Sequence, residues 1–150
     1  MLAVPTQVAI LIAEDDEDDR MILKRAFQDC QVLNKIKFLQ DGQELLDHLK
    51  DSFKGEHVSE SSFLILLDLN MPRLDGREAL KALKKDDVWK KIPVVVLSTS
   101  NNPKDIEYAY ALGANSYFTK PLGYQELIVL VDLLKHYWLN TAKMPLQFVD

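Results

Sequence analysis

The chain has 150 residues, of which 47% are hydrophobic and 27% are charged, and its formal net charge is −5. These values are typical of one globular domain with one core, and they argue against a nucleic-acid-binding surface, which needs clustered Lys and Arg. Because Cys30 is the only cysteine and no apolar run approaches the length of a membrane span, we expect a cytoplasmic protein without internal disulfides or membrane contact.

Five apolar runs of strand length alternate along the chain with segments of helical periodicity. The expected strands span residues 8–13, 35–39, 63–67, 93–97 and 116–119, and the expected helices include residues 22–30, 45–49, 76–83, 105–112 and 123–138. Residues 50–62 are predicted to form a polar loop, and residues 139–150 an irregular tail after a core of about residues 8–138. The basic pair Lys84-Lys85, followed by Asp86, predicts a solvated helix end.

This alternation predicts one α/β domain over residues 1–150, with a doubly wound five-stranded parallel sheet and helices on both faces. Right-handed crossovers leave few topologies, and the flavodoxin-like strand order 2-1-3-4-5 is the expected one. In that order the first and third strands lie side by side at the switch point, where open α/β sheets bind ligands.

Polar residues follow the apolar runs at the point where each strand ends. Because the carboxyl ends of parallel strands meet at one edge of a sheet, we expect these residues to lie close together. Three carboxylates, a hydroxyl and an ammonium at that edge indicate a divalent metal and a phosphoryl group. The residues are Glu14, Asp15, Asp68, Ser98 and Lys120.

The chemistry of this cluster follows from its charges. Carboxylates forced together repel one another, and a hard cation such as Mg²⁺ removes the repulsion while keeping room for water and phosphoryl oxygens. Lys120 adds a second positive charge and Ser98 a hydroxyl donor around Asp68, whose carboxylate can act as a nucleophile towards phosphorus. Solvated loop residues are the simpler explanation for one Asp after a strand, but here five suitable residues follow four strands.

With these motifs the chain resembles the receiver domains of response regulators in two-component signalling, over about residues 8–138. The resemblance is closest to small stand-alone receivers of cyanobacterial and bacterial phytochrome-associated systems, on the loop after the second helix and the tail. The motifs that carry it are Glu14-Asp15, Asp68 with Met71-Pro72 and Gly76, Ser98, and Lys120-Pro121.

The resemblance implies that Asp68 accepts a phosphoryl group from a sensor histidine kinase, with a phytochrome-type kinase as the candidate donor. It also implies that the protein is a signalling phosphoacceptor rather than an enzyme. It implies Mg²⁺ on Asp15, Asp68 and the main-chain carbonyl of Asn70, with Glu14 acting mostly through water. Lys120 would contact the phosphoryl group, and Lys120-Pro121 would be a cis peptide. Ser98 and Tyr117 would be the switch pair, and Asn70 and Ser100, which flank the site, would tune hydrolysis.

Three other functions fit parts of the pattern. A receiver-like interaction module that works without phosphorylation would not need Asp68 and Lys120, both of which are present. Metal-dependent phosphatases with an aspartyl-phosphate usually place a second acid two residues after the nucleophile, where this chain has Asn70. A flavin-binding protein would cradle phosphate in its first loop, which the acidic run 14–19 would instead repel.

The last predicted helix has more apolar surface than one sheet face requires. One stripe, Leu127-Val131-Leu134-Trp138, suffices to cover the sheet, and a second, Leu130-Leu133-Tyr137, is left over. We therefore expect a homodimer through the face of the fourth helix, the fifth strand, the fifth helix and the tail. The alternative is that the tail folds back over the second stripe; its apolar residues are Met144, Leu146, Phe148 and Val149.

Overall fold

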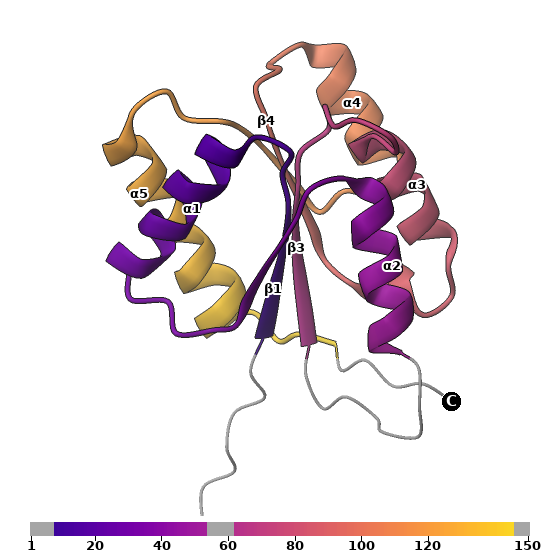
Figure 1. The fold of residues 1–150 in the computed structure, drawn as a ribbon, viewed down its shortest axis with the longest axis horizontal. Helices are drawn as coiled ribbons and strands as arrows, with labels where there is room; N and C mark the ends of the chain where they lie inside the picture. The colour runs from indigo at the N-terminus through magenta and orange to yellow at the C-terminus, as the bar shows by residue number, and fades with distance from the viewer. Residues whose placement is uncertain (1–7, 54–61, 146–150) are drawn as a thin grey trace, which may run out of the picture.

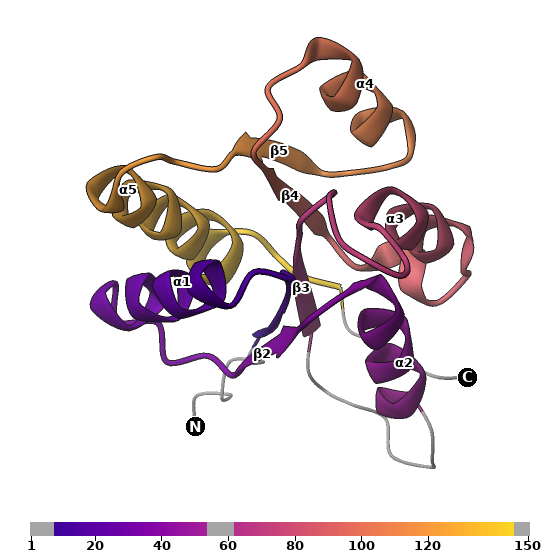
Figure 2. The same cartoon turned by 45° about the horizontal axis from the view of Figure 1, so that its top comes forward.

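The computed structural model describes residues 8–53 and 62–145, and within them five parallel strands form one sheet in the order β2-β1-β3-β4-β5 (Figures 1 and 2). The predicted fold and strand order are therefore confirmed. The strands are β1 (Val8–Ala13), β2 (Ile36–Leu39), β3 (Ser62–Leu67), β4 (Val94–Ser98) and β5 (Ser116–Thr119). The helices are α1 (Glu17–Asp29), α2 (Gly42–Ser52), α3 (Gly76–Lys85), α4 (Pro103–Ala111) and α5 (Tyr124–Leu134), with a 3₁₀ turn η1 (Trp89–Lys91) and a π-helical segment η2 (Lys135–Thr141).

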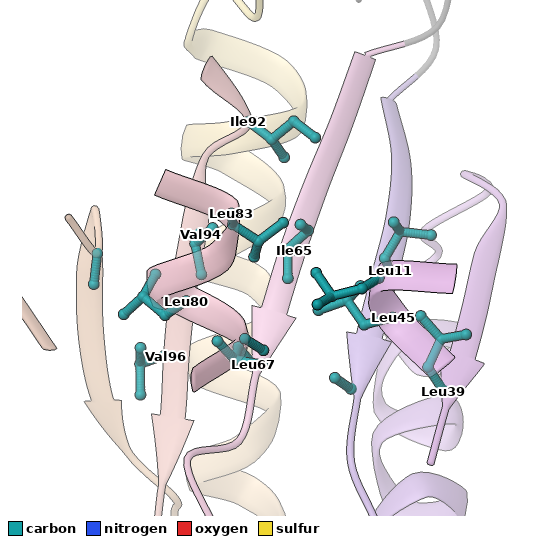
Figure 3. Close-up of a cluster of buried hydrophobic side chains, with 14 of the residues drawn as sticks. Leu11, Leu39, Leu45, Ile65, Leu67, Leu80, Leu83, Ile92, Val94 and Val96 are labelled. Carbon is teal, nitrogen blue, oxygen red and sulfur yellow. The ribbon is translucent and has the colours of Figure 1, made fainter. Parts of the chain in front are cut away.

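Helices cover both faces of the sheet, with α1 and α5 on one side and α2, α3 and α4 on the other (Figure 1). Each residue of β3 is buried, and its side chains alternate between two hydrophobic clusters. Ile65 and Leu67 pack with α2 and α3 in the cluster that Figure 3 shows, whereas Leu64 and Leu66 pack with α1 and α5. This double coverage explains why β3 and β4 are continuous apolar runs.

Among the α-helices of the described residues, all but α5 begin with a side chain that caps the first turn by accepting a main-chain N–H bond. Each cap residue lies at the end of the loop that follows the preceding strand. The capped helices therefore begin close to the carboxyl edge of the sheet. The caps are Asp16, which accepts from Asp19, Asp41 from Glu44, Asp75 from Glu78, and Asn102 from Lys104.

The predicted element boundaries need several corrections: α1 begins at Glu17 and α2 at Gly42, before the residues 22 and 45 at which these helices are predicted to begin. Helix α4 begins at Pro103, two residues before the prediction, because proline lacks only an N–H that the first helical turn leaves unpaired anyway. Helix α2 runs to Ser52, into the predicted loop, and residues 54–61 of that loop lie outside the described residues. The helical path after α5 continues through η2 to Thr141, so the tail begins later than residue 139.

The buried face of α5 is wider than the sequence predicted. Leu130 is only 7% exposed, because α5 packs against α1 as well as against the sheet, so its assignment to a free stripe is wrong. The exposed apolar side chains of α5 and η2 are Val129, Leu133 and Tyr137. Met144 of the tail packs at the edge of the α1–α5 cluster, while the other three apolar tail residues lie outside the described range. No helix in residues 8–53 and 62–145 is long and apolar enough to cross a membrane.

Candidate functional site

The sheet ladder brings four of the predicted site residues to one edge. Ala13 and Leu67 are register partners, so Glu14 and Asp68 leave β1 and β3 side by side. The Asp68 N–H donates to the carbonyl oxygen of Ala13 at 3.1 Å, which extends the pairing one residue beyond the strands. On the other side, the Lys120 N–H donates to the carbonyl oxygen of Ser98 at 2.7 Å. The structure therefore brings Glu14, Asp68, Ser98 and Lys120 to one edge of the sheet.

A cluster of carboxylates forms at this edge. Glu14, Asp15 and Asp68 each offer an oxygen atom within 4.8 Å of the others. Glu14 and Asp68 are buried, with 1% and 6% exposure, whereas Asp15 is open to solvent. An all-oxygen donor set with one solvent-facing side suits a hard divalent cation that keeps part of its water shell.

Lys120 is the positive centre of this cluster. Its Nζ contacts Glu14 Oε1, and it lies 3.1 Å from Asp19 Oδ2 and 3.3 Å from Asp68 Oδ2. Burial opposes the charged ammonium, but the bond to Glu14 and the charge of Asp68 outweigh it and raise the pKa of Lys120 above its ordinary value. Burial also raises the pKa of the Glu14 carboxyl to about 8, with a further rise from Asp68 that Lys120 opposes.

Asp19 is a site residue that the sequence analysis missed. Its position in the sequence indicates only a negative charge near a helix start, where the helix dipole favours it. In the structure Asp16 caps α1 through the Asp19 N–H, and this fixes the first turn so that the Asp19 carboxylate faces Lys120. The dense acidic run 14–19 was the available signal, but which acid points inward depends on the helix phase.

The loop between β3 and α3 holds Asp68 in place. The Asn70 N–H donates to Asp68 Oδ1 at 3.2 Å, and the Gly76 N–H donates to the carbonyl oxygen of Leu69 at 2.9 Å. Arg73 adopts a left-handed conformation, with φ of 61°, and its Nε donates to Asp41 Oδ2 at 2.7 Å. That bond lowers the pKa of the Asp41 carboxyl against the opposing effect of its burial. The loop is thus tied to the start of α2.

The predicted switch residues are linked through the loop after β4. Ser98 is fully buried, and its Oγ accepts a bond from the Ser100 N–H at 3.2 Å. The Tyr117 hydroxyl donates to the carbonyl oxygen of Ser100 at 2.7 Å. Tyr117 and Phe118 pack on opposite faces of the sheet, as strand alternation predicts. The two residues thus meet at Ser100, and their role as a switch stays a prediction.

The peptide bond between Lys120 and Pro121 is trans, so the predicted cis bond is wrong for this structure. The trans form is the lower-energy isomer even before proline, by about 0.5–1 kcal/mol. Lys120 reaches the carboxylate cluster from this trans backbone.

Comparison with known proteins agrees with the geometry. A family model described as "Response regulator receiver domain" matches residues 10–132. Among curated proteins, the probable methanogenesis regulatory protein FilR2 of Methanothrix harundinacea is 37% identical over 136 residues, which cover 91% of this chain and 86% of the relative. Response regulator Rcp1 of Synechocystis is 35% identical and the match covers 91% and 92% of the two chains.

Solved structures give the same result. The phosphorylated cyanobacterial phytochrome response regulator RcpA is 38% identical with a TM-score of 0.81, and the match covers 93% of this chain and 99% of that one. The Mn²⁺-bound form of Rcp1 is 35% identical with a TM-score of 0.78, and the match covers 91% and 98% of the two chains.

Proposed function

The chain belongs to the family of response regulator receiver domains, and from this premise we propose that it accepts a phosphoryl group on Asp68 from a sensor histidine kinase. The receiver domain itself is a signalling module rather than a classical enzyme. The observation that carries the proposal is the buried Asp68 carboxylate, which lies beside Glu14, Asp15 and the Lys120 ammonium at the carboxyl edge of the sheet.

The proposed reaction forms an acyl phosphate. An Asp68 oxygen attacks phosphorus, the bond between phosphorus and the kinase imidazole nitrogen breaks, and the imidazole leaves with the electron pair. Lys120, whose Nζ lies 3.3 Å from Asp68 Oδ2, would hold the negative phosphoryl oxygens, and Ser98 would donate its hydroxyl to them.

The carboxylate cluster fits Mg²⁺ because its donors are all oxygen atoms and one of them faces solvent. Asp15, Asp68 and the main-chain oxygen of Asn70 would hold the ion, with Glu14 acting through water. The ion would supply positive charge between the carboxylates and the phosphoryl group. The Mn²⁺-bound form of Rcp1 and the phosphorylated form of RcpA show that relatives of this chain bind a divalent metal and are phosphorylated.

Treatment with acetyl phosphate and Mg²⁺ is expected to add one phosphoryl group to the wild-type protein, scored by mass spectrometry. Asp68→Asn should abolish the addition because the nucleophile is gone, and Asp15→Ala or chelation of Mg²⁺ should reduce it strongly. Asp18→Asn, which removes an exposed acid of α1 outside the cluster, is the matched control. A wild-type protein that binds Mg²⁺ but gains no phosphoryl group would favour the phosphorylation-independent interaction module.

The kinase partner is proposed to be of the phytochrome type because the solved relative RcpA is described as a phytochrome response regulator. The description of FilR2 as a regulator of methanogenesis points to another signal in a relative of similar identity. Rates of phosphoryl transfer to Asp68 from purified kinases of the same genome would decide between a phytochrome-type kinase and a kinase for another signal. The fastest donor identifies the partner.

We also propose a homodimer through the α4–β5–α5 face. Val129, Leu133 and Tyr137 are spaced four residues apart along α5 and η2 and are 69%, 53% and 53% exposed, so they form one apolar stripe on the surface. Leu133→Glu is expected to weaken association on the order of tenfold or more, because a carboxylate would be buried without a partner.

Sedimentation of the free and the phosphorylated protein would measure the association. Met21→Glu places the same charge at an exposed apolar position of α1 and should leave it unchanged. A wild-type monomer in both states would disprove the dimer, and a dimer that Leu133→Glu leaves intact would place the interface elsewhere.

A further inference from the structure

A series of polar contacts at the rim of the site connects the loop after β3 to the loop after β4. Arg77 of α3 donates from Nη1 to Asn70 Oδ1 at 3.4 Å and from Nη2 to Asp105 Oδ1 at 3.3 Å. The other carboxylate oxygen of Asp105 accepts from the Ser100 hydroxyl at 2.6 Å. We call the Arg77–Asp105 ion pair, with its neighbours Asn70 and Ser100, the latch.

The latch joins four separate elements at the rim of the site. Asn70 lies two residues after Asp68 and Ser100 two residues after Ser98, while Arg77 and Asp105 lie in the first turns of α3 and α4. The Arg77 and Asp105 side chains are 28% and 31% exposed, so the pair is partly shielded from water. The bond from Ser100, with that from Arg77, holds the pKa of the Asp105 carboxyl below its ordinary value against the effect of burial, so this carboxylate stays charged at neutral pH.

Ser100 is the point where the latch meets the predicted switch residues. Its N–H donates to Ser98 Oγ, and its carbonyl oxygen accepts the Tyr117 hydroxyl. Its own hydroxyl is held by Asp105. Each of the three polar groups of Ser100 therefore has a partner, and the loop after β4 is fixed in one arrangement.

We propose that the Arg77–Asp105 pair is a positioning element that holds Ser100, and through it Ser98 and Tyr117, in the arrangement that phosphorylation of Asp68 must change. This inference rests on the proposed function, since it concerns how the chain responds to a phosphoryl group on Asp68.

The argument is one of competing bonds. A phosphoryl oxygen on Asp68 recruits the Ser98 hydroxyl, and Ser98 is bonded to the main chain of Ser100 two residues away. Turning Ser98 towards phosphorus therefore pulls on Ser100, which the latch restrains. The latch thus favours one of two arrangements, and a phosphoryl group favours the other. Removing the latch therefore increases the population of the arrangement that a phosphoryl group favours, even before any phosphoryl group is present.

Asp105→Ala and Arg77→Gln each break the ion pair, and NMR of the Tyr117 ring before and after treatment with acetyl phosphate and Mg²⁺ measures the response. In the free variants the Tyr117 signal is expected to move towards its position in the phosphorylated wild type, so the change on phosphorylation falls to less than about half, since a shifted equilibrium leaves less to shift. Phosphorylation should be faster, on the order of two- to fivefold, the range set by the strength of partly exposed ion pairs.

The double variant should show no larger effect than Asp105→Ala alone, because Arg77 acts on Ser100 only through Asp105. Glu107→Ala removes an exposed carboxylate from the same helix and should behave as the wild type. A Tyr117 response of full size in both phosphorylated single variants would refute the latch while leaving the proposed function intact. A wild type that mass spectrometry shows to be unphosphorylated would refute the proposed function, and the latch with it.

Discussion

Gly76→Ala is expected to displace the loop that carries Asp68 and to slow phosphorylation strongly. A Cβ atom at residue 76 would lie 2.1 Å from the carbonyl oxygen of Asp68 and 2.6 Å from the Cα of Leu69. Both are main-chain atoms, so no side-chain rotation relieves the overlap. The backbone must move instead, at a cost of about 3 kcal/mol, and a nucleophile displaced by about 1 Å loses on the order of a hundredfold in rate.

Urea unfolding and phosphoryl uptake would measure the two effects of Gly76→Ala. Gly123→Ala is the matched control, because a Cβ there meets only the carboxylate of Glu126, the far end of a flexible side chain. We expect the control to change stability by no more than about 0.5 kcal/mol. If Gly76→Ala proves as stable and as active as this control, the loop can relax around a methyl group and the close approach is not essential.

The sequence was sufficient to place Glu14, Asp68, Ser98 and Lys120 together because each ends a strand or directly follows one, and parallel strands end at one edge. That inference needs only the order of elements and the period of two along a strand. It does not depend on how any helix is oriented about its own axis.

The sequence does not determine which side of each helix faces its neighbours in the fold. Leu130 is buried because α5 turns that side towards α1, and no periodicity in one helix reveals its neighbour. Asp19 reaches Lys120 for the same kind of reason. The Arg77–Asp105 pair joins two helices whose relative placement follows from the packed sheet, so the latch could be recognised only in three dimensions.

Lys84 shows how a local charge pattern misleads. The run Lys84-Lys85 predicted a solvated helix end, but Lys84 Nζ donates to the carbonyl oxygens of Ile92 at 2.9 Å and Lys90 at 3.2 Å. Its burial lowers the pKa of this ammonium. The side chain connects α3 to the start of β4. This contact forms only because the turn after α3 brings the main chain of residues 90–92 back beside Lys84.

Lys120→Met is expected to destabilise the protein strongly in the absence of divalent metal and to prevent phosphorylation. Lys120 is the cation that contacts Glu14, Asp19 and Asp68, and the Glu14 and Asp68 side chains are only 2% and 8% exposed. Removing the lysine leaves buried carboxylates without their positive partner, which costs about 3 kcal/mol or more. Methionine keeps the length of the side chain, so the loss is one of charge rather than of volume.

Mg²⁺ should recover stability in Lys120→Met more than it stabilises the wild type, because a bound cation neutralises the same carboxylates. It should not restore phosphoryl uptake, since the ammonium is also needed against the phosphoryl oxygens. Urea unfolding in chelator and in Mg²⁺, together with mass spectrometry, separates the two roles. Lys24→Met, which removes an exposed lysine of α1, is the control for net charge. Wild-type stability of Lys120→Met in chelator would mean that the carboxylates take up protons instead, and wild-type phosphoryl uptake would show that Lys120 has no part in the transfer.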